Sequence, residues 1–323
     1  MSATLQLDVQ MPPGRPPLLR VPDADPHWLT THRGALRQLV TAHGALLVRG
    51  LGLSDPAAIG AVFAELGGPL MVERESFAPR DTYRPGVYTA TKWPAQNPMC
   101  MHHELSYAAE FPGLMMFACR TAATHGGATA VADAAAVLNA LPRGLVDRFA
   151  REGWLLVRNY NDEIGASWAD AFGTDDPAAV ERHCRVGGID FAWQPGGGLR
   201  TWQRRFAVVR HTGTGVFCWF NQVAFLNEWT LEPDVREYLV DVYGPEGLPF
   251  TTRFGHGAPI GDDVVRLIND VYAAHTRREA WQPGDLLLVD NIRTAHSREA
   301  YAGAREVLVG LAEPVRIGDC APR

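Results

Sequence analysis

The stretch NPMCMHHELSY (97–107) places a histidine two positions before a glutamate, at His102 and Glu104. A third candidate ligand, His296, follows the apolar run LLLVD (286–290) near the other end of the chain. Two imidazoles and one carboxylate make up the facial triad that binds non-haem Fe(II) on one side and leaves the other side open. A single His-x-Glu means little in a chain with 11 histidines, so the prediction of a metal site depends on all three residues.

The register of the first stretch decides between His102 and its neighbour His103. Residues two apart on a strand share a face, so an extended segment over 100–106 points His102 and Glu104 together and His103 away. The zinc-protease motif H-E-x-x-H would need a histidine where the chain has Tyr107. We therefore predict that His102 is the ligand.

Two further polar residues suit a dicarboxylate ligand. Arg305 opens the apolar strand REVLVGL (305–311) and shares a face with its valines. An unpaired buried charge costs several kcal/mol, so this guanidinium needs an anionic partner, either a bound dicarboxylate or an internal salt bridge. Thr129 has a hydroxyl that can donate to the same carboxylate. Arg293 and Arg298 are the rival arginines, and we expect both to be exposed in a turn.

Apolar patterns elsewhere predict one domain over 1–323 without a linker. Strands are expected over 44–53, 215–223, 284–291 and 305–313, and helices over 28–42, 56–68 and 133–149. The proline-rich residues 1–26 predict an irregular arm, and residues 154–222 a long insertion that covers the core as a lid. Strands from both ends of the chain around a metal favour a β-rich α+β fold: a jelly-roll (double-stranded β-helix) core with flanking helices.

Composition excludes several classes of partner. A net charge of -6 and a pI near 6.0 disfavour nucleic acid, which binds to basic surfaces. The chain contains no apolar stretch of about 18 residues, so no membrane span is expected. The five cysteines are odd in number and lack C-x-x-C spacing, which indicates reduced thiols. The N-terminus has no signal-peptide pattern, so we expect a cytoplasmic protein.

The motifs together resemble the taurine dioxygenase/clavaminate synthase-like group of Fe(II)/2-oxoglutarate oxygenases. Within that group, the chain is most similar to the branch of syringomycin-type amino-acid hydroxylases. The similarity extends over nearly the whole length. It is carried by GALLVRG (44–50), HHELSY (102–107), PGLMMFACRTAATHGGATAVAD (112–133), WFNQ (219–222), WQPGDLLLVDNIRTAHSR (281–298) and YAGAR (301–305).

The resemblance implies that His102, Glu104 and His296 hold Fe(II). It also implies that Thr129 and Arg305 hold the distal carboxylate of 2-oxoglutarate, with O2 as the second cosubstrate. The implied reaction is hydroxylation of an unactivated C–H bond in a small amino-acid-like substrate, free or tethered to a carrier protein, in specialised metabolism. Desaturation or oxidative cyclisation with the same cofactors, a zinc hydrolase, and a non-catalytic binding protein are the alternatives.

Candidate substrate residues come from the expected lid. An amino-acid carboxylate held there needs a guanidinium, and Arg204 and Arg205 are the candidates, with Arg200 close by. The alternative is that these arginines only solvate a loop. Asn221, in WFNQ, is a further candidate because the resemblance places that segment near the active site.

Overall fold

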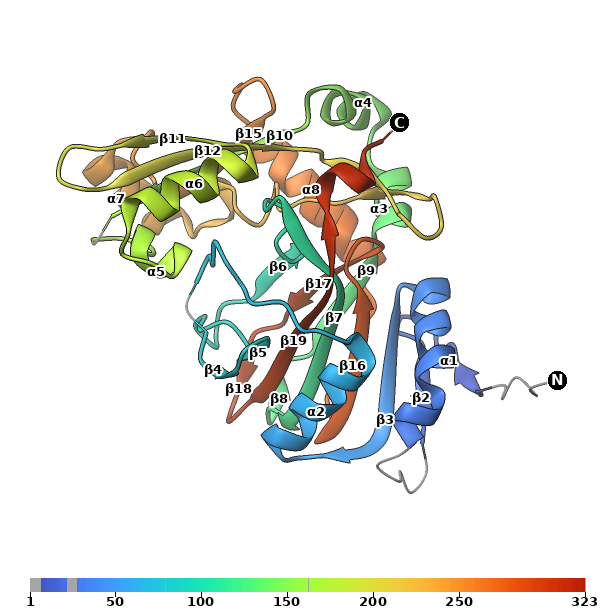
Figure 1. The fold of residues 1–323 in the computed structure, drawn as a ribbon. Helices are drawn as coiled ribbons and strands as arrows, with labels where there is room; N and C mark the ends of the chain where they lie inside the picture. Colours follow the sequence, from blue (N-terminus) through green and yellow to red (C-terminus); the bar gives the residue numbers. More distant parts are fainter. Residues whose placement is uncertain (1–6, 22–27, 79, 162, 323) are drawn as a thin grey trace.

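The computed structural model describes residues 7–21, 28–78, 80–161 and 163–322. These ranges form a mixed α/β, sheet-rich molecule in which helices and a second group of strands surround the central sheets (Figure 1). Over the described ranges, no helix is both long enough and apolar enough to cross a lipid bilayer.

The larger central sheet has eight strands, drawn from both ends of the chain. In spatial order they are β1 (Val9–Gln10), β2 (Leu18–Arg20), β3 (Ala45–Leu53), β16 (Gly284–Asp290), β7 (Glu110–Thr121), β19 (Glu306–Arg316), β5 (Val87–Thr89) and β4 (Thr82–Arg84). Neighbours pair antiparallel except β2 and β3, which run parallel. We expected residues 1–26 to form an irregular arm. That prediction is wrong for β1 and β2, which are hydrogen-bonded into this sheet. Residues 1–6 and 22–26 lie outside the described ranges.

A smaller sheet has β17 (Thr294–Arg298) in the middle, flanked by β6 (Met99–His102) and β9 (Thr129–Asp133). Its apolar residues join the inner face of the larger sheet in one core cluster. Alternation along β16 shows how the faces divide. Leu287 and Val289 belong to this cluster, whereas Leu286 and Leu288 belong to a second cluster. Beside these sheets, β8 (His125–Gly126) pairs with β18 (Tyr301–Ala302).

The second core cluster lies under two helices, α1 (Trp28–His43) and α2 (Pro56–Gly67), which were both predicted. Asp55 caps α2 by accepting a hydrogen bond from the backbone N–H of Ala58 at 2.8 Å, as expected for a residue before a proline at the first turn. The helix packs closely on β19, where a Cβ added at Gly310 would lie 2.5 Å from the ring of Phe63. Helix and sheet therefore form one packed unit.

The helical pattern predicted over 133–149 is divided into two helices, α3 (Ala134–Ala140) and α4 (Arg143–Glu152). Asp133 caps the first through the backbone N–H groups of residues 135 and 136. Pro142 lies between the two helices. It interrupts the pattern because proline has no N–H to donate the hydrogen bond that a continuous helix needs.

The remaining elements form a group beyond one end of the central sheets, at the top of Figure 1. Four strands make a sheet in the order β11 (Ile189–Trp193), β12 (Leu199–Arg205), β10 (Trp154–Tyr160) and β15 (Phe250–Phe254). The insertion was expected to end at 222, but its sheet includes β15, which lies later in the chain. The other elements are α5 (Trp168–Phe172), α6 (Pro177–Gly187), β13 (Val208–Arg210), β14 (Phe217–Trp219), η1 (Glu228–Thr230), α7 (Pro233–Tyr243), α8 (Asp262–His275) and η2 (Ile317–Cys320).

Candidate metal centre

His102 and His296 face each other as direct partners on the neighbouring strands β6 and β17. Their ring centroids lie 4.3 Å apart. The Nδ1 of His102 lies 2.8 Å from the carbonyl oxygen of Cys100. A carbonyl only accepts, so this nitrogen carries the proton and Nε2 keeps its lone pair. Strand pairing thus brings together two imidazoles that are far apart in the sequence.

Glu104 reaches the histidines from a turn. We expected an extended segment over 100–106, but β6 ends at His102 and the backbone turns from Glu104 to Tyr107. The side-chain amide of Asn291 holds this turn: its Oδ1 accepts from the N–H of Glu104 at 2.8 Å, and its Nδ2 donates to the Glu104 carbonyl at 2.9 Å. This role of Asn291 was not predicted, because nothing near Asp290 in the chain indicates a contact with residue 104.

The three predicted ligands converge. Ligand atoms of His102, Glu104 and His296 lie within 4.8 Å of one another, and all three side chains are buried. The Oε2 atom of Glu104 is 3.6 Å from the Nε2 atom of His296. His103 points elsewhere, as predicted: its Nδ1 donates to the carbonyl of Asn291, and its ring packs on Phe220.

The electrostatics suit a metal ion. Burial, followed by the nearby His296, lowers the pKa of His102 to about 3, which keeps the imidazole neutral. Burial alone would raise the pKa of Glu104, but Arg80 and the two histidines lower it overall, so the carboxyl group stays ionised. Neutral imidazoles and an ionised carboxylate are the protonation states that bind a metal. Two nitrogen donors and one oxygen donor also match the donor set for non-haem Fe(II).

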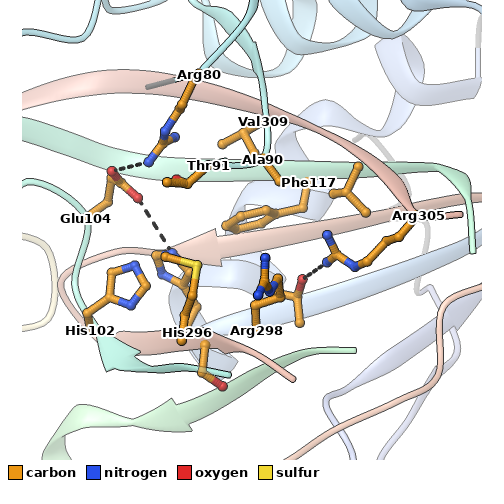
Figure 2. Close-up of a pocket in the computed structure, with 14 residues that line it drawn as sticks. Arg80, Ala90, Thr91, His102, Glu104, Phe117, His296, Arg298, Arg305 and Val309 are labelled. Carbon is orange, nitrogen blue, oxygen red and sulfur yellow. Dashed lines mark hydrogen bonds and ion pairs between the residues drawn. The ribbon is translucent and has the colours of Figure 1, made fainter. Parts of the chain in front are cut away.

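Arg80 is a second residue that sequence analysis missed. Its Nη2 donates to the Oε1 of Glu104 at 2.8 Å, and its Nε lies 3.4 Å from the Oε2 of Glu73. Figure 2 shows Arg80 on the opposite side of Glu104 from His296. Burial opposes its charge, but Glu104 and Glu73 outweigh it and raise the pKa of Arg80. Arg80 lies in an irregular segment where no hydrophobic period indicates which side chains point inward.

The cavity that contains the three ligands also contains Arg305 and Thr129. Arg305 lies just before β19 and donates from Nε to the Gly127 carbonyl at 2.8 Å and from Nη2 to the Thr129 hydroxyl at 3.3 Å. Its hydrogen-bond partners in the described part of the chain include no carboxylate, so the expected alternative of an internal salt bridge is not observed. Burial, with Arg298 nearby, lowers the pKa of Arg305 to about 10. Figure 2 shows Arg305 at the far end of the cavity from Glu104, with Phe117 between them.

The expectation that Arg298 is exposed is wrong. Arg298 ends β17, is 6% exposed and lines the same cavity. Its two terminal nitrogens donate to the carbonyls of Trp93, Pro94 and Asn97, so it holds the 93–97 segment against the cavity. The side chain turns inward because strand β17 continues past His296, which the apolar pattern did not reveal.

The substrate residues predicted in the insertion do not reach this cavity. Arg205 is buried and donates to backbone carbonyls that include those of Tyr107 and Gly187, while Arg204 donates to the carbonyl of Glu152. Asn221 donates to the carbonyl of residue 207 and accepts from the N–H of residue 223. These contacts support the backbone, which corrects the expectation that the three residues contact a substrate.

Comparison with known proteins agrees with this geometry. The family model described as "Taurine catabolism dioxygenase TauD, TfdA family" matches residues 14–312. The chain belongs to the TauD/TfdA family. It is 33% identical over 281 residues to the dapdiamide synthesis protein DdaC of Enterobacter agglomerans, a match that covers 86% of this chain and 84% of DdaC.

Two further similarities extend over most of the chain. The clavaminate synthase-like protein At3g21360 of Arabidopsis thaliana is 26% identical over 295 residues, which cover 88% of this chain and 86% of that protein. The solved structure of PvcB, described as an Fe, alpha-ketoglutarate dependent oxygenase from an isonitrile synthetic pathway, superposes with a TM-score of 0.56. PvcB is 16% identical, and the match covers 98% of this chain and 97% of PvcB, so it shows a shared fold.

Family membership gives the class of enzyme. The protein is a 2-oxoglutarate-dependent oxygenase, and TauD/TfdA enzymes use Fe(II), 2-oxoglutarate and O2. This assignment removes the zinc hydrolase and the non-catalytic binding protein from the alternatives raised by the sequence. The cluster of His102, Glu104 and His296 has the donor types that this chemistry needs.

Proposed function

We propose that this enzyme hydroxylates an unactivated C–H bond of an amino acid or an amino-acid-derived substrate in specialised metabolism. His102, Glu104 and His296 would hold Fe(II), and Arg305 with Thr129 would hold the distal carboxylate of 2-oxoglutarate. One observation carries the proposal: a single cavity has the three candidate ligands at one end and, at the other, the half-buried Arg305, which has no carboxylate partner among the described residues.

The arginine end of the cavity suits one carboxylate of a short dicarboxylate. The Nε and Nη2 atoms of Arg305 donate hydrogen bonds to Gly127 and Thr129, and the same side chain also lines the cavity. A charge-assisted contact to a carboxylate would offset the burial of this guanidinium. Arg298 adds positive charge nearby while its terminal nitrogens remain bound to carbonyls. Phe117 and Val309 line the cavity with apolar surface, which suits the methylene groups between two carboxylates.

When bound, iron with 2-oxoglutarate and O2 supplies the oxidising chemistry, and the protein supplies binding, orientation and exclusion of water. The carbonyl of Cys100 orients the imidazole of His102 and fixes its tautomer. Phe225 stacks on that imidazole with ring centroids 4.6 Å apart and covers it from one side. Phe117 packs against the ring of His296 at 5.1 Å. These aromatic rings restrict the space around the ligands and keep water out.

A second cavity on the side of Arg80 is our candidate for the substrate. It shares Arg80, His102 and Glu104 with the first cavity and is also lined by Phe77, Phe225 and Gln222. Through Phe77 and Ala78 it borders a third cavity, which lies between the irregular residues 77–78 and 92–93 and the strands β10 and β15 of the upper group. We propose that the upper group acts as the lid and that the substrate approaches along this series of cavities.

The amino-acid class rests on the relatives. DdaC is named for dapdiamide synthesis, and PvcB is described as part of an isonitrile pathway. We propose a substrate that is either a free amino acid or one tethered to a carrier protein, and the screen below distinguishes the two. We further propose that the two central sheets are the halves of a jelly roll and that the chain is one domain. The five unpaired cysteines favour a cytoplasmic location.

The test is a screen for coupled turnover. The enzyme is incubated with Fe(II), 2-oxoglutarate, O2 and a panel of amino acids, both free and loaded on a carrier protein. Succinate and product mass are measured. Hydroxylation adds one oxygen atom, whereas desaturation or oxidative cyclisation removes two hydrogen atoms. Glu104→Ala should form no succinate. If wild-type protein loaded with Fe(II) formed no succinate with any member of the panel or without substrate, the proposal would fail.

A further inference from the structure

The two oxygens of the Glu104 carboxylate have different partners, and one of these partners is Arg80. Its Nη2 donates to Oε1 at 2.8 Å, while Oε2 faces the Nε2 of His296 at 3.6 Å. The guanidinium and the imidazole lie on opposite sides of the carboxylate (Figure 2). One oxygen is therefore occupied by a charge-assisted hydrogen bond, and the other is directed toward the candidate metal position.

Arg80 is itself held in place from the far side. Its Nε lies 3.4 Å from the Oε2 of Glu73, and the side chains of Arg80, Glu73 and Glu104 are at most 10% exposed. The backbone N–H of Glu73 donates to the hydroxyl of Tyr88 at 2.8 Å, which ties this segment to β5. The guanidinium thus hydrogen-bonds to Glu104 and forms an ion pair with Glu73, so two buried carboxylates constrain its position.

Further along the same segment, Glu75 anchors the chain to the upper group of strands. Its backbone carbonyl accepts from Tyr107 at 2.9 Å and from Arg158 at 3.0 Å. Its carboxylate contacts His183 on α6 at 2.8 Å. These contacts fix the segment before Arg80, and after it the backbone N–H of Asp81 donates to the Thr89 hydroxyl at 3.0 Å. This is the rigidity that a side chain needs to orient a metal ligand.

We propose that Arg80 is a positioning residue that makes Glu104 bind the metal through Oε2 alone. The inference rests on the proposed iron site. A carboxylate that uses one oxygen leaves one more coordination position open than a carboxylate that uses both. Those positions are needed for 2-oxoglutarate and O2, so a second oxygen from Glu104 would compete with the cosubstrates. Arg80 prevents this by keeping Oε1 engaged.

If Arg80 positions Glu104, its removal should change the metal affinity in the opposite direction from the change expected if Arg80 acts only through its charge. Removing a positive charge beside a cation site should tighten metal binding if charge alone mattered. Removing an outer partner of a ligand weakens metal binding by about 10–100-fold when that partner orients the ligand. Arg80→Met is the variant that separates them, because methionine keeps much of the side-chain length but has neither charge nor donor.

The experiment titrates metal-free protein with Co(II) and records affinity and the visible absorption of the bound ion. We expect Arg80→Met to bind Co(II) about 10–100-fold more weakly, and to absorb more weakly because Glu104 then uses both oxygens. Arg74→Met is the matched control, since Arg74 is exposed on the same segment and should leave both readouts unchanged. Wild-type or tighter binding by Arg80→Met would overturn the inference, and so would an unchanged spectrum.

Arg80→Lys keeps the test decisive if the methionine variant does not fold. Lysine keeps the charge and can reach one carboxylate, but it lacks the fork that bridges two. We expect its Co(II) affinity to lie between those of wild type and Arg80→Met; affinity equal to wild type would contradict the inference. His102→Ala separates the two proposals. If His102→Ala and the Arg80 variants all bind Co(II) as wild type does, the proposed iron site is wrong. If His102→Ala loses Co(II) binding but the Arg80 variants do not, only the role of Arg80 is rejected.

Discussion

At the scale of single residues, His102 and His103 show how one position along a strand changes the role of a side chain. Both are buried, and they have the same chemistry. His102 lies opposite His296 in the smaller sheet, whereas His103 donates to the carbonyl of Asn291 on the other side. His102, as period 2 predicted, lies with Glu104 and His296, although the chain turns at Glu104 and is not extended over 100–106 as expected.

This difference makes a paired prediction. His102→Ala, Glu104→Ala and His296→Ala should each abolish tight Fe(II) binding, because each removes one of three protein ligands. His103→Ala should retain Fe(II) binding within a few-fold. It should lose about 1–3 kcal/mol of stability, because it empties a buried site and leaves the Asn291 carbonyl without its donor. Metal titration and thermal unfolding of the four variants check both parts. Retention of iron by His102→Ala with loss by His103→Ala would mean that the register is shifted by one residue.

A second residue-scale prediction concerns Arg305. Arg305→Ala should raise the 2-oxoglutarate concentration for half-maximal turnover by roughly 10–100-fold, the effect of losing a charge-assisted contact worth roughly 1.5–3 kcal/mol. Fe(II) binding should survive, because Arg305 lies at the other end of the cavity from the ligands. Arg293→Ala is the control, since Arg293 pairs with Asp133 and should not affect 2-oxoglutarate. Equal titrations for wild type and Arg305→Ala would assign the carboxylate to another arginine.

At the scale of elements, the site depends on three parts that meet: the strand pair β6–β17, the turn that carries Glu104, and the irregular residues 71–78 with Arg80. The strands are joined by a ladder of backbone hydrogen bonds, whereas the irregular segment is held by side chains and by backbone hydrogen bonds from Met71 and Ser76. Arg158, on β10, donates to the carbonyls of Glu75 and Ser76 at 3.0 Å each. The upper group of strands therefore supports the residues beside the metal centre.

Loss of this support should be measurable by hydrogen exchange. In Arg158→Gln, we expect the amides of Glu73 and Ser76 to exchange at least about 10-fold faster, because two hydrogen bonds from a charged donor are lost, each worth roughly 1.5–3 kcal/mol. Amides in β16 should keep their protection, since that strand lies in the larger central sheet. Arg200→Gln is the control, because Arg200 pairs with the exposed Glu246. Unchanged exchange across 71–80 would show that the segment is held without Arg158.

The packing of α2 on β19 gives a second prediction at this scale. Gly310→Ala should destabilise the protein by about 1–3 kcal/mol, because the new methyl group would overlap the ring of Phe63. Gly144→Ala is the opposite case: Gly144 lies in α4 with open space around its Cα, so alanine should stabilise by about 0.4–1 kcal/mol. Denaturant unfolding of both variants tests the pair. A neutral Gly310→Ala would mean that α2 can move away from the sheet.

At the scale of the whole molecule, the candidate metal centre joins parts of the chain that are far apart in sequence. The candidate ligands come from β6, from the turn after it and from β17, and Arg80 comes from a segment supported by β10. The proposed single domain should therefore unfold as one unit. Metal that binds only the folded state should stabilise all of it.

The corresponding prediction is about metal removal. Mn(II) added to metal-free protein at about 100 times its Kd should stabilise the fold by about 2.7 kcal/mol and raise Tm by several degrees. One transition should be seen with and without metal. The metal ligand variant Glu104→Ala should show no such shift, which controls for nonspecific binding. Two separate transitions, with only one sensitive to metal, would show that the upper group of strands is an independent domain.

The sequence by itself determined much of this protein. Apolar runs and helical patterns located β3, β16, β19, α1 and α2, because buried strands and amphipathic helices need apolar residues at these positions. Spacing and side-chain chemistry indicated His102, Glu104 and His296, since few residue types bind iron. An arginine that opens an apolar strand indicated Arg305, because buried charge needs a partner.

Only the tertiary structure decided the surroundings of those residues. Arg80, Asn291 and Arg298 carry no periodic signal, and their roles arise from contacts with residues far away in the chain. Arg204 and Arg205 failed as substrate residues for the same reason: their guanidinium groups are used by nearby carbonyls, which a sequence pattern does not contain. Local patterns report which face of an element is apolar. Which polar group lies across from another depends on long-range packing, and that is settled only when the chain folds.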